Sequence, residues 1–403
     1  MLWEEPGKYK TLEIIKKLSY LQIDAIFSTA RSQDIVLHNR STTYKEEDVW
    51  KLLKTNKIFE GFAHARCLIS IDELPFYYAK MLRKREQIPS WYKLVADELD
   101  WQGEILETTK IKKEIGVKDI SIPDNFPQFT GWSNAPKRML DYLSTRGFIF
   151  SSKREKFQSF YKLPNHQYKN FKKIISNLPS REEEFLFHIK STLRAAGPSP
   201  LHRLLHYKYI HSSIDMGGKK ISPRTLVSNY IREGILSEIN VETSNGKDDK
   251  YLCLPDQSDM ITNIQQKDLE EYNCFLLSPF DNALWSREAL LAQYNFDYKM
   301  EVYVPQEKRI YGFFTLPVLY GPDFVGRVDV KLDRKSKVFH WIKWSWEPKY
   351  KQIKSKTNFW KKLSESIERF VLFHGVTKTN LGNISKTKQN KIRKLMTIQL
   401  IDE

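Results

Sequence analysis

Gln22 and Asp24, in the stretch LQIDAI, are the residues whose types and spacing best suit chemistry. They lie two positions apart, so in an extended segment both side chains project from one face. One carboxylate and one amide could then meet a substrate together. The same pattern fits a simpler arrangement, in which Asp24 caps a turn and Gln22 is exposed, and the pattern alone favours that arrangement. The motif is too short to decide between them.

Basic residues follow this pair. Arg31, His38 and Arg40 come directly after it, and they could bind the phosphates that flank a reacting nucleotide. Each of them also fits ordinary solvated surface. His64 and Arg66 alternate with apolar neighbours in FAHARC, which we interpret as a strand with both side chains on one face. The competing interpretation of His64 is a structural histidine.

A second basic group lies near the C-terminal end. Arg327, Asp329 and Lys331 should share one face of a strand in GRVDVKLDR, and Lys308 and Arg309 lie near a turn. Basic residues on a hairpin suit a DNA backbone or a minor groove. A salt-bridged exposed strand explains the same pattern equally well.

Two stretches share an architecture that could present such residues to DNA. Residues 137–163 and 224–254 each contain an apolar helical stripe, a glycine that ends the helix, and alternating residues typical of a hairpin. The stripes are formed by Met139, Leu140 and Leu143 in the first stretch, and by Leu226, Tyr230 and Ile231 in the second, whose hairpin should turn near Asn245-Gly246. A helix followed by a charged hairpin is how a winged helix ends, so the two copies predict a tandem array.

The rest of the chain completes this prediction. Residues 9–70 could form a third unit, whereas from about 270 onward strand-like runs, YKMEVYVP among them, alternate with turns. Residues 95–130 should connect two units, and the tail 355–403 combines a helix with a basic segment. We therefore predict an α+β protein with about three tandem winged-helix units and a C-terminal antiparallel β domain. The expected boundaries are 1–94, 95–178, 179–268 and 269–403.

The charge balance points to a polyanionic partner. Lys and Arg number 65 against 49 Asp and Glu, a net charge of +16, and neutralising phosphates releases condensed counterions. Nucleic acid is the first choice, with an anionic membrane surface second. No apolar run approaches the roughly 20 residues that span a bilayer, and the N-terminus has no signal-peptide pattern. We expect a cytoplasmic, nucleoid-associated protein.

Cysteines and histidines give no metal or disulfide framework. The three cysteines are far apart, and the i, i+4 pair His202 and His206, with His211 beyond it, has no acidic residue or cysteine at ligand spacing nearby. Walker loops, GxGxxG, GxSxG, HExxH and a nuclease-type acidic cluster are all missing. We expect no metal and no cofactor. Composition and pattern by themselves indicate a DNA-binding protein with several winged helices.

Collinear motifs add a family resemblance. At residues 20–40 and 276–331 the chain resembles winged-helix DNA glycosylases of the YcaQ/AlkZ type, which excise N7-alkylated purines and unhook interstrand crosslinks. The resemblance rests on YLQIDAI, ARSQDIVLHNR, IFEGFAHA, GW, KRMLDYL, LLSPFDNALW, FDYKMEVYVP, RIYGFFTLP and VGRVDVKLDR. It extends in order over nearly the whole chain, which makes it far more specific than any single motif.

The resemblance implies a function and a site. In that family a Q-apolar-Q or Q-apolar-D motif lies at the catalytic centre, here Gln22-Ile23-Asp24, and the Asp form is similar to the branch with the broader crosslink and monoadduct range. It implies three winged helices and a β domain around a DNA channel. We expect a monofunctional glycosylase in base excision repair, a monomer on double-stranded DNA, without lyase activity. A non-catalytic winged-helix regulator is the alternative.

Two departures from the family pattern stand out. A further helix usually precedes the segment that matches TLEIIKKLSYLQ, so the first unit is expected to be short, and Phe62 replaces the more usual Trp in EGFAHA. Neither departure touches Gln22 or Asp24.

Overall fold

The N-terminal part of the chain is a small three-stranded sheet surrounded by helices. The computed structural model describes residues 6–90, 92, 100–124, 126, 134–207, 214–244, 246–265, 272–348, 350–353 and 357–401. The sheet has the order β1-β3-β2 and is antiparallel throughout. The elements of this part are α1 (Thr11–Leu18), β1 (Tyr20–Gln22), α2 (Ser32–His38), α3 (Glu46–Lys54), β2 (Ile58–Phe62), β3 (Arg66–Ser70), η1 (Ile71–Glu73) and α4 (Leu74–Glu86).

Two helix-and-hairpin segments follow along the chain. The first holds α6 (Trp101–Lys112), η2 (Val117–Asp119), α7 (Ala135–Thr145), β4 (Phe150–Glu155), β5 (Gln158–Lys162), α8 (Pro164–Gln167) and α9 (Phe171–Ile174). The second holds α10 (Arg181–Ala196), α11 (Leu201–Tyr207), β6 (Ile214–Met216), β7 (Lys219–Ile221), α12 (Pro223–Arg232), β8 (Ser237–Glu242), β9 (Asp248–Cys253) and α13 (Pro255–Gln265). The interval 95–130, expected to be a connection, therefore contributes a helix of its own, α6.

Both predicted helical stripes lie on helices that end where the glycines indicated. On α7 and α12 the apolar stripe is buried, apart from Ile231, which is half-buried. Gly147 and Gly234 follow the two helices with φ of 67° and 70°, a conformation that disfavours residues with a Cβ. The β8–β9 hairpin turns at the predicted place, where Gly246 has a φ of 74° and Asn245 lies outside the described residues.

The C-terminal part is built on a six-stranded sheet. The first four strands, in the order β10-β11-β12-β13, are antiparallel as predicted, whereas the short strands β14 and β15 add to the edge in parallel. Its elements are β10 (Cys274–Leu276), η3 (Asn282–Leu284), α14 (Arg287–Tyr294), η4 (Gln306–Lys308), β11 (Thr315–Tyr320), β12 (Asp323–Asp333), β13 (Val338–Trp346), α15 (Tyr350–Ile353), α16 (Thr357–Phe373), β14 (Lys378–Asn380), α17 (Lys386–Arg393) and β15 (Gln399–Leu400).

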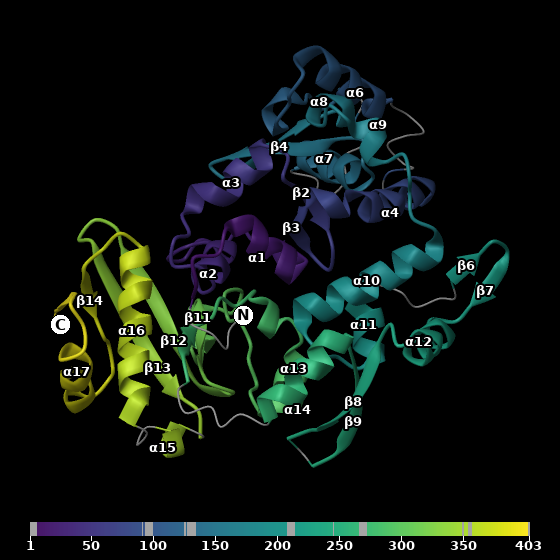
Figure 1. Ribbon diagram of the computed structural model, residues 1–403. Helices are drawn as coiled ribbons and strands as arrows, with labels where there is room; N and C mark the ends of the chain where they lie inside the picture. The colour runs from purple at the N-terminus through teal and green to yellow at the C-terminus, as the bar shows by residue number, and fades with distance from the viewer. Residues whose placement is uncertain are drawn as a thin grey trace.

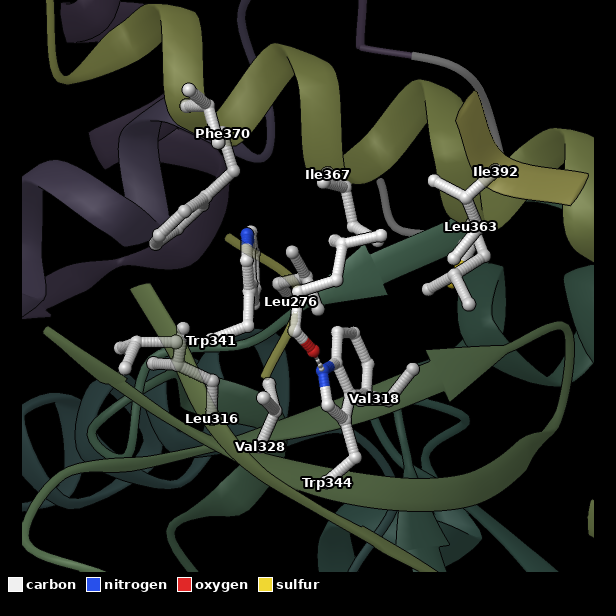
Figure 2. Close-up of a cluster of buried hydrophobic side chains, with 14 of the residues drawn as sticks. Leu276, Leu316, Val318, Val328, Trp341, Trp344, Leu363, Ile367, Phe370 and Ile392 are labelled. Atoms are coloured by element: carbon white, nitrogen blue, oxygen red, sulfur yellow. Dashed lines mark hydrogen bonds between the residues drawn. The ribbon is translucent and has the colours of Figure 1, made fainter. Parts of the chain in front are cut away.

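The long helix α16 packs its apolar side on this sheet and closes the largest core. Figure 2 shows Leu363, Ile367 and Phe370 pointing from the helix toward Trp341 and Trp344 of β13. Trp344 also donates its indole N–H to the Leu381 carbonyl at 3.1 Å, so its polar atom is satisfied within the core.

Segments far apart in the sequence meet around the N-terminal sheet. In Figure 1 this purple part lies between the blue elements α6 to α9, the teal helix α10 and the yellow-green C-terminal sheet. Ala30 and Ile35, although they follow β1 closely in sequence, are buried in the core of the C-terminal sheet. The segment after Gln22 is therefore fixed by the C-terminal part of the chain. None of the helices in the described ranges is long and apolar enough to cross a bilayer.

One predicted strand does not form. Residues 298–305, YKMEVYVP, contain no strand, because the backbone here is satisfied locally instead of by a neighbouring strand. The Glu301 carboxylate accepts the backbone N–H groups of Tyr311 and Gly312 at 2.8 and 3.1 Å, and Val304 N–H donates to the Glu301 carbonyl at 2.9 Å. An alternating apolar pattern does not distinguish this folded loop from a strand.

Candidate active site

Gln22 is the last residue of β1 and lies opposite Cys67 of β3. Its side chain is 9% exposed. His64 Nε2 is 2.9 Å from Gln22 Oε1, and because an amide oxygen only accepts, the imidazole donates this hydrogen bond. The amide N–H groups of Gln22 donate to no group among the described residues, so they remain free for a substrate or a water.

Asp24 lies two residues beyond Gln22. Ile23 N–H donates to the Arg66 carbonyl at 3.0 Å, which extends the strand pairing by one residue, and the Ile23 side chain is buried in the core. Strand alternation therefore turns Gln22 and Asp24 to the face opposite Ile23. Asp24 is half-buried, and its Oδ1 accepts Ile26 N–H at 2.8 Å.

This hydrogen bond is the turn-capping role that the sequence pattern favoured for Asp24. It occupies only one carboxylate oxygen. Within the described ranges no group donates to Oδ2 of Asp24, so the carboxylate is held through one oxygen while the other is open, two positions along the chain from the Gln22 amide. Such an arrangement can stabilise a nearby positive charge and hold a water.

Three aromatic rings form a wall behind Gln22. The indole of Trp285 stacks on Tyr20 at 4.9 Å between centroids, and it lies 4.1 Å from the His64 ring. Trp285 directly follows η3. Within η3, Asn282 donates its Nδ2 N–H to the Tyr20 carbonyl of β1 at 3.2 Å. The C-terminal part of the chain thus packs directly against the residue that holds Gln22.

His64 does not lie on a strand as predicted. β2 ends at Phe62 and β3 begins at Arg66, so His64 is in the tight connection between them, where Ala63 N–H donates to the Ala65 carbonyl at 3.0 Å. The turn directs His64 toward Gln22. Arg66 points elsewhere: its guanidinium bonds Asp141 of α7 at 2.6 Å and lies 3.6 Å from Glu60.

Arg31 braces the loop after Asp24. Its Nη1 donates to the Ala25 carbonyl at 3.0 Å, and its guanidinium lies 3.7 Å from the centre of the Phe157 ring. Phe157 is at the tip of the β4–β5 hairpin with a φ of 68°, a costly conformation for a phenylalanine. Burial lowers the pKa of Arg31 from its ordinary value, but the guanidinium stays charged at any working pH.

The C-terminal sheet braces the same loop from another side. Arg334, just beyond β12, donates Nη2 to the Thr29 carbonyl at 2.9 Å, and Ser28 Oγ donates to the Val330 carbonyl at 3.5 Å. The Arg334 guanidinium also lies 4.4 Å from the ring of Phe27, which is 48% exposed. Sequence reasoning missed Phe27, Arg334 and Trp285 as site residues; of these, Trp285 and Arg334 lay inside the quoted motifs LLSPFDNALW and VGRVDVKLDR.

Three residues predicted to contact DNA are in the interior, and for them the prediction is wrong. His38 is 6% exposed and stacks on Phe373, and burial, reinforced by nearby Arg369 and His374, lowers its pKa to about 3, which leaves it neutral. Arg40 is 3% exposed because it pairs with the buried Asp281. Arg327 is 2% exposed.

Arg327 and Lys331 do not share a surface. Arg327 bonds Glu347 at 2.6 Å and the Asp297 carbonyl at 2.9 Å, and the irregular segment before β11 covers its face of the sheet. A register shift lies between Asp329 and Val330, after which Lys331 is exposed. Lys308, on η4, is also exposed, and Arg309 is half-buried with its guanidinium near Phe313. Lys308, Arg309 and Lys331 remain predicted DNA contacts.

The histidine pair lies in a pocket that holds charges of both signs. His202 and His206 line this pocket of about 530 Å³ together with Trp285, Arg203, Arg287 and Glu288, and Glu288 is 3.5 Å from Arg203. His211 lies outside the described residues. Within the described ranges, no three side chains from His, Cys, Asp and Glu gather closely enough to hold a metal ion.

Comparisons with known proteins agree with this architecture. The fold is similar to that of the DNA glycosylase AlkZ of Streptomyces sahachiroi, with a TM-score of 0.60 and 15% sequence identity over 93% of this chain and 94% of that one. The family model described as DNA glycosylase AlkZ-like matches residues 15–373. This match contains every element that positions Gln22 and Asp24 and covers nearly the whole chain. The chain therefore belongs to the AlkZ-like family of DNA glycosylases.

Proposed function

We propose that this glycosylase hydrolyses the N-glycosidic bond of N7-alkylated purines and unhooks interstrand crosslinks attached at such purines. N7 alkylation gives the base a positive charge, so it leaves without a general acid. The catalytic demand then falls on the sugar, which develops oxocarbenium character. A carboxylate beside that sugar stabilises the cation and orients or deprotonates a water.

The open oxygen of Asp24 is the observation that carries this proposal. We assign the oxocarbenium and the water to Asp24, and the positioning of the water or sugar to Gln22, whose amide is held by His64. Glycosylases that also cut the strand use an amine nucleophile, whereas the roles assigned here need only a carboxylate and an amide. We therefore propose base excision without lyase activity.

We further propose that the chain embraces DNA with three winged helices, at 1–94, 95–178 and 179–268, followed by the β domain at 269–403. Helices α3, α7 and α12 are each followed by an antiparallel hairpin, which supports this division. Exposed Lys308 and Lys331, with Arg31 beside the catalytic loop, would contact phosphates. We expect a monomer that acts on double-stranded DNA in the nucleoid.

The decisive experiment uses an oligonucleotide duplex with a single N7-methylguanine. After incubation, hot alkali converts any abasic site into a strand break, and a parallel sample without alkali reports lyase activity. Asp24→Asn is the key variant because the asparagine oxygen can still accept Ile26 N–H, so the turn is kept and only the charge is removed. Gln22→Ala tests the amide.

Asp215→Asn is the matched control, since Asp215 Oδ1 accepts Gly218 N–H at 2.8 Å in an exposed hairpin far along the chain from the site. We expect alkali-dependent cleavage by wild type and by the control, and a fall of at least ~100-fold in Asp24→Asn with binding retained. Tight binding without cleavage of this substrate or of a crosslinked duplex would instead indicate a non-catalytic DNA-binding protein.

A further inference from the structure

Phe27 is an exposed aromatic ring held in place beside the catalytic loop. It lies three residues beyond Asp24 and is 48% exposed. Moving a phenylalanine ring out of water lowers the free energy of the system. A ring that its surroundings hold half in solvent is therefore a candidate contact for a ligand. Two guanidinium groups contact it, those of Arg31 at 5.0 Å and Arg334 at 4.4 Å from the ring centre.

The backbone that carries this ring is fixed at several points. Asp24 caps the turn through Ile26 N–H, Arg31 holds the Ala25 carbonyl, and Arg334 holds the Thr29 carbonyl. Phe27 and Arg31 also form an antiparallel β-bridge. The position of the ring relative to Asp24 is therefore set before any ligand binds, which lowers the entropic cost of using it.

The two arginines retain hydrogen-bonding capacity. Each guanidinium has five N–H donors, and each donates to one backbone carbonyl within the described part of the chain. Both guanidinium groups lie over the Phe27 ring, and that of Arg31 is closer still to the Phe157 ring. An exposed apolar ring beside two cations complements a base step of DNA, in which stacked bases are bordered by a phosphate on each strand.

We propose that Phe27 inserts into the base stack at the lesion, while Arg31 and Arg334 bind the neighbouring phosphates. The inserted ring would occupy the gap beside the damaged nucleotide and keep its sugar facing Asp24. This assignment rests on the proposed function, in which Asp24 is the catalytic carboxylate. Phe27 is a positioning residue, since it contacts bases next to the reacting sugar and takes no part in the bond changes.

The test measures base stacking and excision separately. A duplex carrying a stable tetrahydrofuran abasic site is labelled with 2-aminopurine as the neighbouring base, whose fluorescence is high because it lacks one stacking partner and falls when an aromatic ring stacks on it. Binding of wild type should lower this fluorescence, and Phe27→Ala should bind without lowering it. Single-turnover excision of N7-methylguanine by Phe27→Ala should fall roughly 5- to 150-fold, the range expected from losing one aromatic–base stack. Phe27→Tyr should restore both signals.

Leu372→Ala is the control, because Leu372 is also 48% exposed but lies on α16. Its excision rate should match wild type, and its thermal midpoint should be close to that of Phe27→Ala, since the two side chains are exposed to the same extent. If wild type excises the base while Phe27→Ala keeps both the fluorescence decrease and the full rate, the insertion proposal is wrong. If wild type excises nothing, the proposed function itself fails, whatever the fluorescence shows.

Discussion

Arg40 and Asp281, 241 positions apart in the sequence, form a bidentate ion pair in the interior of the protein. Nη1 and Nη2 of the arginine lie 2.7 and 2.8 Å from the two carboxylate oxygens, and the side chains are 3% and 0% exposed. The pair joins the end of α2 to the segment that carries Trp285. It therefore connects α2, which follows the loop after Asp24, to the aromatic wall behind Gln22.

Removing one charge of this pair should destabilise the protein strongly. In Asp281→Asn the cap on Ala283 N–H is retained, but the Arg40 charge is left buried without its partner, which costs about 3–5 kcal/mol. Glu238→Gln is the control, because Glu238 pairs with Lys250 at 2.6 Å but the side chains of Lys250 and Glu238 are 73% and 35% exposed. This variant should lose less than about 1 kcal/mol of unfolding free energy. Urea unfolding at pH 7 measures both. Equal losses of unfolding free energy in the two variants would show that the buried Arg40–Asp281 pair contributes no more to stability than the exposed pair.

The sequence alone could predict the local elements, and it singles out Gln22 and Asp24 as a candidate site, an assignment that stays a prediction. Leu226 and Tyr230 form a helical stripe that Gly234 ends, and this pattern is complete within a dozen residues. Gln22 and Asp24 were proposed from their spacing and from the family motif. Local hydrogen bonding and chain entropy decide such features, so they are visible in a short window.

The partners of the basic residues could not be predicted in this way. Arg327 on a strand has the same local pattern whether it faces solvent or Glu347, which lies 20 positions further along. Arg40 acquires a buried partner only when the C-terminal segment packs on α2. Whether a charged side chain is buried depends on which distant segment packs over it. The periodicity of a single sequence does not identify that segment.

The hydrogen bond between His64 and Gln22 should be worth a measurable part of catalysis. His64→Phe keeps a ring beside Trp285 but cannot donate to Gln22 Oε1, so the amide loses its fixed orientation. We expect a fall of roughly 3- to 10-fold in the single-turnover excision rate, with little change in affinity for lesion DNA. If His64 acts through Gln22, the double variant with Gln22→Ala should be no slower than Gln22→Ala alone. Additive losses would assign His64 a separate function.

The exposed and buried basic residues of the C-terminal part should respond differently to salt. Lys308→Ala should weaken DNA binding and reduce the slope of log K against log salt by about 0.9, as expected for one lost phosphate contact. Arg327→Ala should leave that slope unchanged but lower the free energy of unfolding by about 3 kcal/mol or more, because Glu347 loses its partner. Fluorescence anisotropy at four salt concentrations and urea unfolding distinguish the two. A lower slope in Arg327→Ala would contradict its structural assignment.

Two buried histidines should make the protein sensitive to acid. Burial lowers the pKa of His38 to about 3 and that of His374 to about 4. Below pH 6.5 the unfolded chain takes up protons that the folded chain does not, so each histidine costs about 1.4 kcal/mol of stability per pH unit as the pH falls toward its folded value. His38→Phe should remove about 2 kcal/mol of the loss between pH 6.5 and 5. The exposed His166→Phe serves as the control for replacing a histidine by phenylalanine outside the interior.

Asp34 should act in the opposite direction. Burial raises the pKa of this α2 carboxyl to about 7, an effect that the hydrogen bond from Tyr44 Oη at 2.6 Å opposes. The folded protein therefore retains a proton on Asp34 that the unfolded chain loses near pH 4, so the stability contributed by the neutral form falls as the pH rises from about 4 to 7. Asp34→Asn can still accept from Tyr44 and carries no charge. Relative to wild type, we expect its advantage in stability to be roughly 2 to 3 kcal/mol larger at pH 8 than at pH 5. Urea unfolding at both pH values decides the matter, since a difference that does not grow with pH would show that Asp34 is already ionised in the folded protein at pH 5.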